Sequence, residues 1–307
     1  MKSKSHGPYG LMFHYFHDGL KHKPSQGSIS KDQFEKILKK VDLENIIPAK
    51  KWADKTENDS LENNEICITF DDGLRCQYDV ALPILEKYNL TAFWFVNSST
   101  LVGEINNLEI FRRFRNDYFS SITEFYDTFF STALESNYKN EVKQGLEKFP
   151  KNYLSEFTFY TLEDRKFRYL RDKVLNPIQY EIITKNIMKL KGVTTKDLAK
   201  DLWISDKQLC TLKKMDHIIG IHSHSHPTVL VNLSYEEQKR EYEKNIEILS
   251  DILNEKPFTM AHPCNSYSDE TLEILDKMGI KIGFCSNMMK TNYSKLEIPR
   301  KDSALLI

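Results

Sequence analysis

The chain has 307 residues, of which 40% are hydrophobic and 28% charged, with 43 basic side chains against 44 acidic ones. This length fills one large domain or two smaller ones, and the balanced charge excludes an electrostatic argument for nucleic acid as the main partner. The five cysteines have no paired spacing, and no segment resembles a signal peptide or a transmembrane helix, so we predict a soluble protein in a reducing, cytoplasmic compartment, with peripheral contact to the inner membrane left open.

The first part of the chain alternates predicted strands and helices. Ser30 and Gln33 have capping-box spacing ahead of an apolar stripe, which predicts a helix start. Strands are expected at residues 9–17, 65–70 and 91–96, and helices at residues 31–41 and 77–88. The polar residues 50–64 are expected to form a loop.

The alternation stops at residue 97 and returns at about residue 204. Residues 97–203 are rich in Phe, Tyr, Lys and Glu and poor in Gly and Pro, which predicts a helical insertion, a lid or subdomain. Beyond it, strands are expected at residues 217–221, 257–263 and 281–287, helices at residues 206–215, 235–253 and 268–279, and a short tail at residues 297–307. Residues 1–96 and 204–307 therefore form the predicted α/β part, a parallel sheet or barrel with its chemistry at the carboxyl ends of the strands.

Two carboxylates and two imidazoles follow predicted strands of this part. Asp71 and Asp72 end the segment ITFDDG, and His222 and His226 lie four residues apart in HSHSH. One carboxylate and two imidazoles are typical ligands of a catalytic divalent cation with open coordination positions. Asp72 would then be neutralised by the cation, which leaves Asp71 free to act as a base on water.

Three segments carry a resemblance to a known family. ITFDDG, IGIHSHSHP and MAHPCNSYSDETLEIL resemble the first three motifs of the polysaccharide deacetylase family, carbohydrate esterase family four with its NodB-like homology domain. The resemblance implies a distorted (β/α) barrel of about seven strands that removes acetyl groups from N-acetyl sugars with a divalent metal. It covers about two thirds of the chain and leaves the insertion without a counterpart.

The resemblance also implies roles for individual residues. Asp71 matches the general base, and Asp72, His222 and His226 match the metal ligands. Cys264 stands where the family has a Tyr whose backbone N–H contacts the oxyanion, a role that needs no particular side chain.

The sequence departs from the family pattern at two places. Ala261 replaces the Arg that pairs with the base, and Arg300 is our candidate for that role. The late Leu-x-His motif of the general acid is missing, but LMFH resembles a permuted branch of the family with this histidine near the amino terminus. His14 is therefore the candidate acid, His17 is the second choice, and His262 is a further candidate for lining the pocket.

We expect a metal-dependent hydrolase that removes an N-acetyl group from an amino sugar or glycan precursor, in the biosynthesis of a bacterial surface polysaccharide. The partner is then an N-acetylated sugar or glycan. Zinc is the default metal, and cobalt, nickel and iron suit the same ligands. An O-deacetylase, an amidase acting on a non-sugar, and a non-catalytic glycan-binding protein on a decayed deacetylase fold stay open as alternatives.

Overall fold

The structure, a computed structural model, describes residues 7–155, 160–290 and 292–306. Residues 1–6 and 307 of the predicted α/β part, residues 156–159 of the predicted insertion and residue 291 lie outside the described residues. The chain divides into two compact units. The barrel unit lies within Met1–Asn106 and Asp201–Ile307, and the helical unit within Asn107–Lys200.

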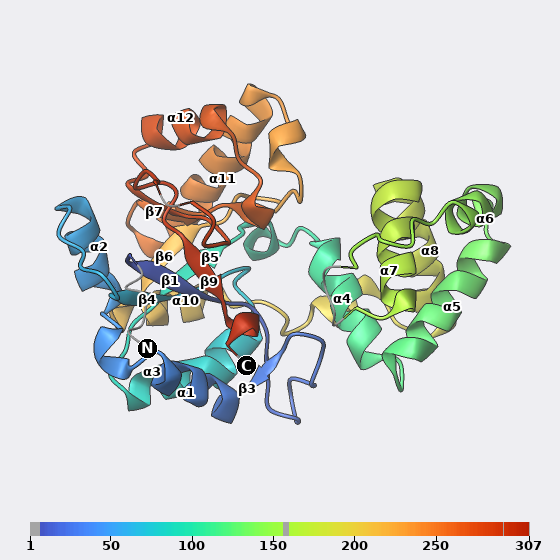
Figure 1. Ribbon diagram of the computed structural model, residues 1–307, viewed down its shortest axis with the longest axis horizontal. Helices are drawn as coiled ribbons and strands as arrows, with labels where there is room; N and C mark the ends of the chain where they lie inside the picture. Colours follow the sequence, from blue (N-terminus) through green and yellow to red (C-terminus); the bar gives the residue numbers. More distant parts are fainter. Residues whose placement is uncertain (1–6, 156–159, 291, 307) are drawn as a thin grey trace. The chain divides into compact units, whose positions relative to one another are not determined.

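Seven parallel strands form the sheet of the barrel unit (Figure 1). In spatial order they are β8 (Ile282–Phe284), β7 (Thr259–Ala261), β6 (Ile218–Ile221), β5 (Phe93–Val96), β4 (Ile66–Phe70), β1 (Tyr9–Phe13) and β9 (Arg300–Asp302). Backbone bonds also join the two outer segments: Cys285 N–H donates to Ile298 O at 2.9 Å and Arg300 N–H to Asn287 O at 3.2 Å. The sheet is thus a nearly closed barrel, and the predicted (β/α) barrel of about seven strands is confirmed.

The strands form because both of their faces are buried. Every residue of β4 and β5 is buried, and such continuous apolar runs are typical of parallel sheets covered by helices. Successive side chains point to opposite faces, so Trp94 and Val96 pack with the helices while Phe93 and Phe95 join a second cluster with Phe284.

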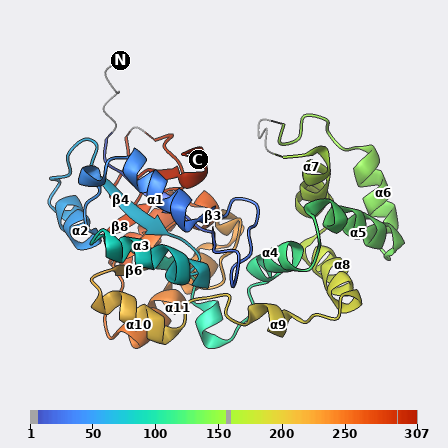
Figure 2. The same cartoon turned by 90° about the horizontal axis from the view of Figure 1, so that it is seen from below.

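Helices surround the strands of the barrel unit (Figures 1 and 2). They are α1 (Lys31–Lys40), α2 (Ala49–Glu57), α3 (Leu82–Lys87), α10 (Asp206–Lys214), α11 (Tyr235–Leu253) and α12 (Asp269–Lys277). The predicted helix starts at Ser30, Ser205 and Ser234 all form capping boxes, in which the serine and the residue three positions on exchange hydrogen bonds. A two-stranded parallel pair, β2 (Phe16–His17) and β3 (Ile29–Ser30), lies between β1 and α1 in the sequence.

Two predictions of local structure were wrong, those for residues 50–64 and for the tail, and one predicted helix was confirmed with a different first turn. The expected loop at residues 50–64 begins as α2, because Trp52, Ala53 and Thr56 form a buried stripe within a lysine-rich segment. The expected helix at residues 77–88 begins with one turn of π-helix, η2 (Gln77–Ala81), before α3. The expected tail contains β9, which pairs in parallel with β1.

In the part of the helical unit that the structure describes, all regular secondary structure is helical. They are α4 (Asn107–Asp117), α5 (Ile122–Glu135), α6 (Lys139–Glu147), α7 (Leu162–Tyr169), the π-helix η4 (Leu170–Val174), α8 (Pro177–Leu190) and α9 (Thr195–Ala199). Its core is aromatic: Phe125, Phe129 and Phe167 are buried and lie in mutual edge or tilted ring contact. Among the helices that the structure describes in either unit, none combines the length and apolarity needed to cross a membrane.

His217, at the amino end of β6, makes the stability of the barrel depend on pH. The backbone N–H of Ala92 donates to its Nδ1 at 2.9 Å, which requires an unprotonated nitrogen. Burial lowers the pKa of His217 from 6.5 to about 4. The unfolded chain therefore binds this proton more readily, and stability falls as the pH drops below about 6.5 and levels off near the folded pKa.

Lowering the pH from about 7 to about 4.5 should reduce the free energy of unfolding of the unchanged protein by about 2 kcal/mol more than that of the variant His217→Asn. Asn can accept the Ala92 N–H through Oδ1 but does not titrate in this range. Urea unfolding of both proteins at the two pH values measures the difference, and parallel losses of stability would contradict the role of His217.

Candidate active site

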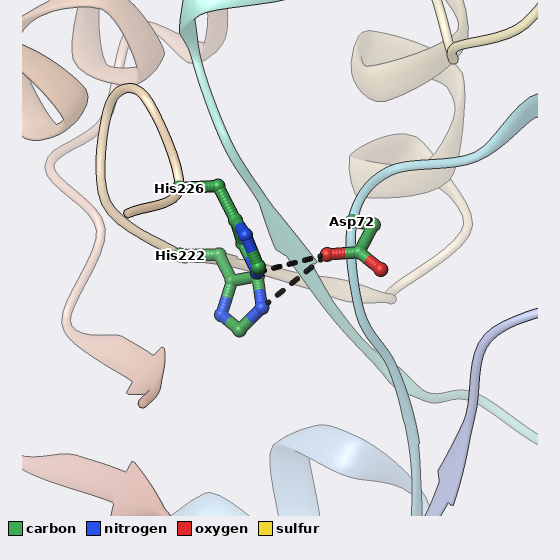
Figure 3. Close-up of side chains that lie close together, drawn as sticks. All are labelled: Asp72, His222 and His226. Carbon is green, nitrogen blue, oxygen red and sulfur yellow. Dashed lines mark ion pairs between the residues drawn. The ribbon is translucent and has the colours of Figure 1, made fainter. Parts of the chain in front are cut away.

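The three predicted metal ligands meet at the carboxyl ends of the strands (Figure 3). Asp72 follows Asp71 just beyond the end of β4, and His222 and His226 lie in the loop after β6. Oδ1 of Asp72 is 3.5 Å from Nε2 of His222 and 3.3 Å from Nε2 of His226. All three residues are buried, and their ligand atoms lie within 4.8 Å of one another.

Left-handed backbone conformations turn these side chains toward one another. Asp72, Ser223 and His226 have φ of 72°, 59° and 57°, which non-glycine residues rarely adopt. Gly73 follows with φ of 60°, and a Cβ there would also lie 3.1 Å from a methyl carbon of Val96. Strained residues of this kind cost on the order of 1–3 kcal/mol each and gather at functional sites.

The donor atoms fit a divalent cation. Nδ1 of His222 lies 2.8 Å from the carbonyl oxygen of Ala261, which only accepts, so Nδ1 carries the proton and Nε2 presents a lone pair. Burial opposes the charge of Asp72, but the neighbouring imidazoles, His222 first, outweigh burial when they are protonated and hold the pKa of Asp72 below its usual value. Two imidazole nitrogens and one carboxylate oxygen suit zinc, cobalt, nickel or iron.

Asp71 lies beside the three predicted metal ligands and forms a bidentate ion pair with Arg300. The distances are 2.6 Å from Nη1 to Oδ1 and 2.7 Å from Nη2 to Oδ2. Nε of Arg300 donates to Cys285 O at 2.7 Å and Nη1 to Thr69 Oγ1 at 3.1 Å, so the buried guanidinium is well supplied with acceptors. Burial would raise the pKa of Asp71, but Arg300 and the nearby imidazoles outweigh it and lower this pKa.

Gly10 of β1 gives Arg300 room to reach the carboxylate. A Cβ at this position would lie 3.0 Å from Cγ and 3.3 Å from Cδ of Arg300, closer than side chains normally pack. Neither Gly10 nor Thr69 could be singled out from the sequence, because both lie within strands and act only through a residue that is distant along the chain.

The structure separates the two candidate acids. Nε2 of His14 lies 3.7 Å from Oδ2 of Asp71, and the His14 side chain is 29% exposed. His17 lies in β2 with Nδ1 2.9 Å from Ser28 Oγ, and the described part of the chain shows no bond from it to either aspartate. The geometry therefore favours His14.

Gln77 links His14 to Asp71 by hydrogen bonds, and this role was not predicted from the sequence. Its side-chain amide is buried and donates to His14 O at 2.8 Å and to Asp71 O at 2.6 Å. Gln77 occupies the first position of the π-helix η2, a local distortion that is common at functional sites and has no periodic signal in the sequence.

The third motif contains two candidate site residues, of which Cys264 lies at the surface and His262 in the interior. Cys264 is exposed and has φ of 49°. His262 is buried, its Nε2 donates to Leu296 O at 2.8 Å, and its ring stacks on Tyr267 at 4.0 Å. Burial lowers the pKa of His262 to about 4, so the ring is neutral near pH 7.

Comparison with known proteins supports the resemblance. A family model described as polysaccharide deacetylase matches residues 58–125 and 156–283, which together make up well over half of the chain. A search of curated proteins found no match.

Several solved structures share the fold at low sequence identity. The Streptococcus pyogenes deacetylase PplD in complex with acetate is 16% identical with a TM-score of 0.57, and the match covers 97% of this chain and 93% of that one. IcaB from Ammonifex degensii is 14% identical with a TM-score of 0.57, covering 96% and 91%. A de-N-acetylase from Aggregatibacter actinomycetemcomitans is 12% identical with a TM-score of 0.55, covering 96% and 95%. The family model matches well over half of the chain, and solved structures share its fold along nearly its whole length. The chain therefore belongs to the polysaccharide deacetylase family.

Proposed function

We propose that this deacetylase is metal-dependent and removes the N-acetyl group of an amino sugar or glycan precursor, in the biosynthesis of a bacterial surface polysaccharide. The observation that carries the proposal is the pair of adjacent aspartates with separate partners. Asp72 faces two imidazoles, and Asp71 is held by Arg300. Metal binding alone uses Asp72, His222 and His226, so an ionised Asp71 held beside these residues supports a site that performs chemistry.

Each residue has a distinct task in this proposal. A divalent cation bound by Asp72, His222 and His226 would supply Lewis acidity, which lowers the pKa of water and polarises the acyl oxygen. Asp71 accepts a proton from the attacking water, and the guanidinium of Arg300 fixes both carboxylate oxygens and keeps them ionised.

His14 and Cys264 complete the proposed set. An amine leaves only after protonation, whereas an alkoxide leaves more readily, so an acid near the base favours N-acetyl over O-acetyl substrates. His14, whose Nε2 lies 3.7 Å from Asp71, is the proposed acid that protonates the leaving nitrogen. The backbone N–H of Cys264 is the proposed donor to the oxyanion.

The test measures acetate and free amine released from an N-acetylglucosamine oligomer. Removing the metal with a chelator is expected to lower the rate at least about a hundredfold, and zinc added back should restore it. A chelated sample restored with zinc is the control for damage by the chelator.

An O-acetylated sugar serves as the competing substrate. Release of acetate from this ester alone would make the protein an O-deacetylase, and an unchanged rate without metal would contradict the metal requirement. A protein that binds the oligomer and turns over neither substrate would be a glycan-binding protein.

A further inference from the structure

The loop that carries both histidines is held by helix α11. The buried side chain of Asn245 accepts a hydrogen bond from His222 N–H at 2.8 Å and donates one to Val96 O at 3.1 Å. The pairing of β5 with β6 ends at Val96 and Ile221, one residue before His222. The amide of Asn245 thus bridges the two strand ends as a backbone peptide would in a ladder, and it fixes how far they separate.

One turn earlier, Glu241 holds the second half of the loop. Its carboxylate accepts hydrogen bonds from Ser225 N–H and Ser225 Oγ–H, both at 2.7 Å. Ser225 directly precedes His226, whose left-handed backbone costs energy and persists only when the surrounding structure holds it. Glu241 therefore stabilises the conformation that turns His226 toward Asp72.

Lys244, on the same helix face, reaches the loop through a third link. Its Nζ lies 2.8 Å from Glu104 Oε1, and Glu104 Oε2 lies 3.0 Å from Nε2 of His224. Residues 241, 244 and 245 have the i, i+3, i+4 spacing that places side chains on one face of a helix. This single face therefore contacts the loop directly at His222 and Ser225 and reaches His224 through Glu104.

We propose that Asn245 and Glu241 are positioning residues for the metal site, which hold His222 and His226 in place before a cation binds. The inference rests on the proposed function only in taking Asp72, His222 and His226 as metal ligands. A loop without these contacts would have to be ordered by the metal itself, and the cost of ordering would appear as weaker binding. Residues that hold a ligand or its neighbour in place in this way typically change metal affinity by about 10–100-fold.

The experiment measures zinc affinity by competition with a chromophoric chelator and records the absorption spectrum of the Co²⁺-loaded protein. Asn245→Ala and Glu241→Ala are each expected to weaken zinc binding by at least about tenfold and to alter the Co²⁺ bands, which report ligand geometry. Glu241→Gln keeps an acceptor oxygen for Ser225 and should restore most of the affinity. Glu247→Ala, which removes an exposed carboxylate on the same helix, is the control and should leave both measurements unchanged.

Every outcome decides the proposal. Parent-like zinc affinity and an unchanged Co²⁺ spectrum in Glu241→Ala would overturn it even if Asn245→Ala fails to fold. An equal loss in Glu241→Gln and Glu241→Ala would show that charge acts here, and would overturn positioning by hydrogen bonds. A parent that binds zinc but releases no acetate would contradict the proposed function and leave the affinity comparison valid, whereas a parent that binds no metal would overturn both.

Discussion

Asp71→Asn is expected to lower kcat about a thousandfold while the protein still binds its metal. The amide has the size of the carboxylate but cannot accept a proton from water. The three proposed metal ligands are untouched, because Asp71 lies beside them and pairs with Arg300. The measurements are kcat on the N-acetylglucosamine oligomer and the amount of zinc bound per chain.

Asp79→Asn is the matched control for this change. Asp79 also pairs with cationic groups, at 2.6 Å from Lys21 Nζ and 2.8 Å from Arg75 Nε, and these pairs lower its pKa to about 2 against the effect of burial. It has no place in the proposed chemistry, so its variant should keep nearly full activity. If Asp71→Asn is as active as the parent, the assignment of the general base is wrong.

Arg300→Met is expected to destabilise the barrel by about 3–5 kcal/mol, because it leaves the carboxylate of Asp71 buried without its partner. Without the guanidinium, burial is less opposed and raises the pKa of Asp71. The acidic limb of the kcat/KM profile should therefore move to higher pH, since the base form of Asp71 is lost earlier as the pH falls. Urea unfolding and a pH profile measure the two effects.

A double-mutant cycle separates the ion pair from general damage. Asp71→Asn combined with Arg300→Met leaves neither charge, so the double variant should be destabilised by less than the sum of the single ones. Arg240→Met, an exposed arginine on α11, is the control and should change stability by less than about 0.5 kcal/mol. Additive losses in the cycle would argue against a coupled pair.

The sequence predicted the parts of the fold that depend on local pattern. The continuous apolar runs of β4 and β5 and the capping serines of α1, α10 and α11 are signals within a few residues, and the structure has them where expected. Helix α2 was missed because lysines surround its narrow buried stripe at Trp52 and Ala53. The π-helix at Gln77 and the strand β9 carry no periodicity of their own.

The candidate site was predictable to the extent that its residues end strands. Asp72, His222 and His226 lie at carboxyl ends of parallel strands, which must share one edge of the sheet, and the structure brings them together. The pairing of Arg300 with Asp71 spans 229 residues, and only the missing family arginine at Ala261 suggested it. Asn245 could not be found in this way, because a buried amide on a helix has meaning only once the strand ends beside it are placed.

The position of Arg300 in β9 also has a consequence for biosynthesis. A nascent chain can make Asp71 and the first three barrel strands while residue 300 is still inside the ribosome. During that time the carboxylate of Asp71 has no guanidinium to pair with, and strand β1 lacks its neighbour β9. The barrel and the surroundings of the Asp71 carboxylate are therefore completed only when β9 docks against β1.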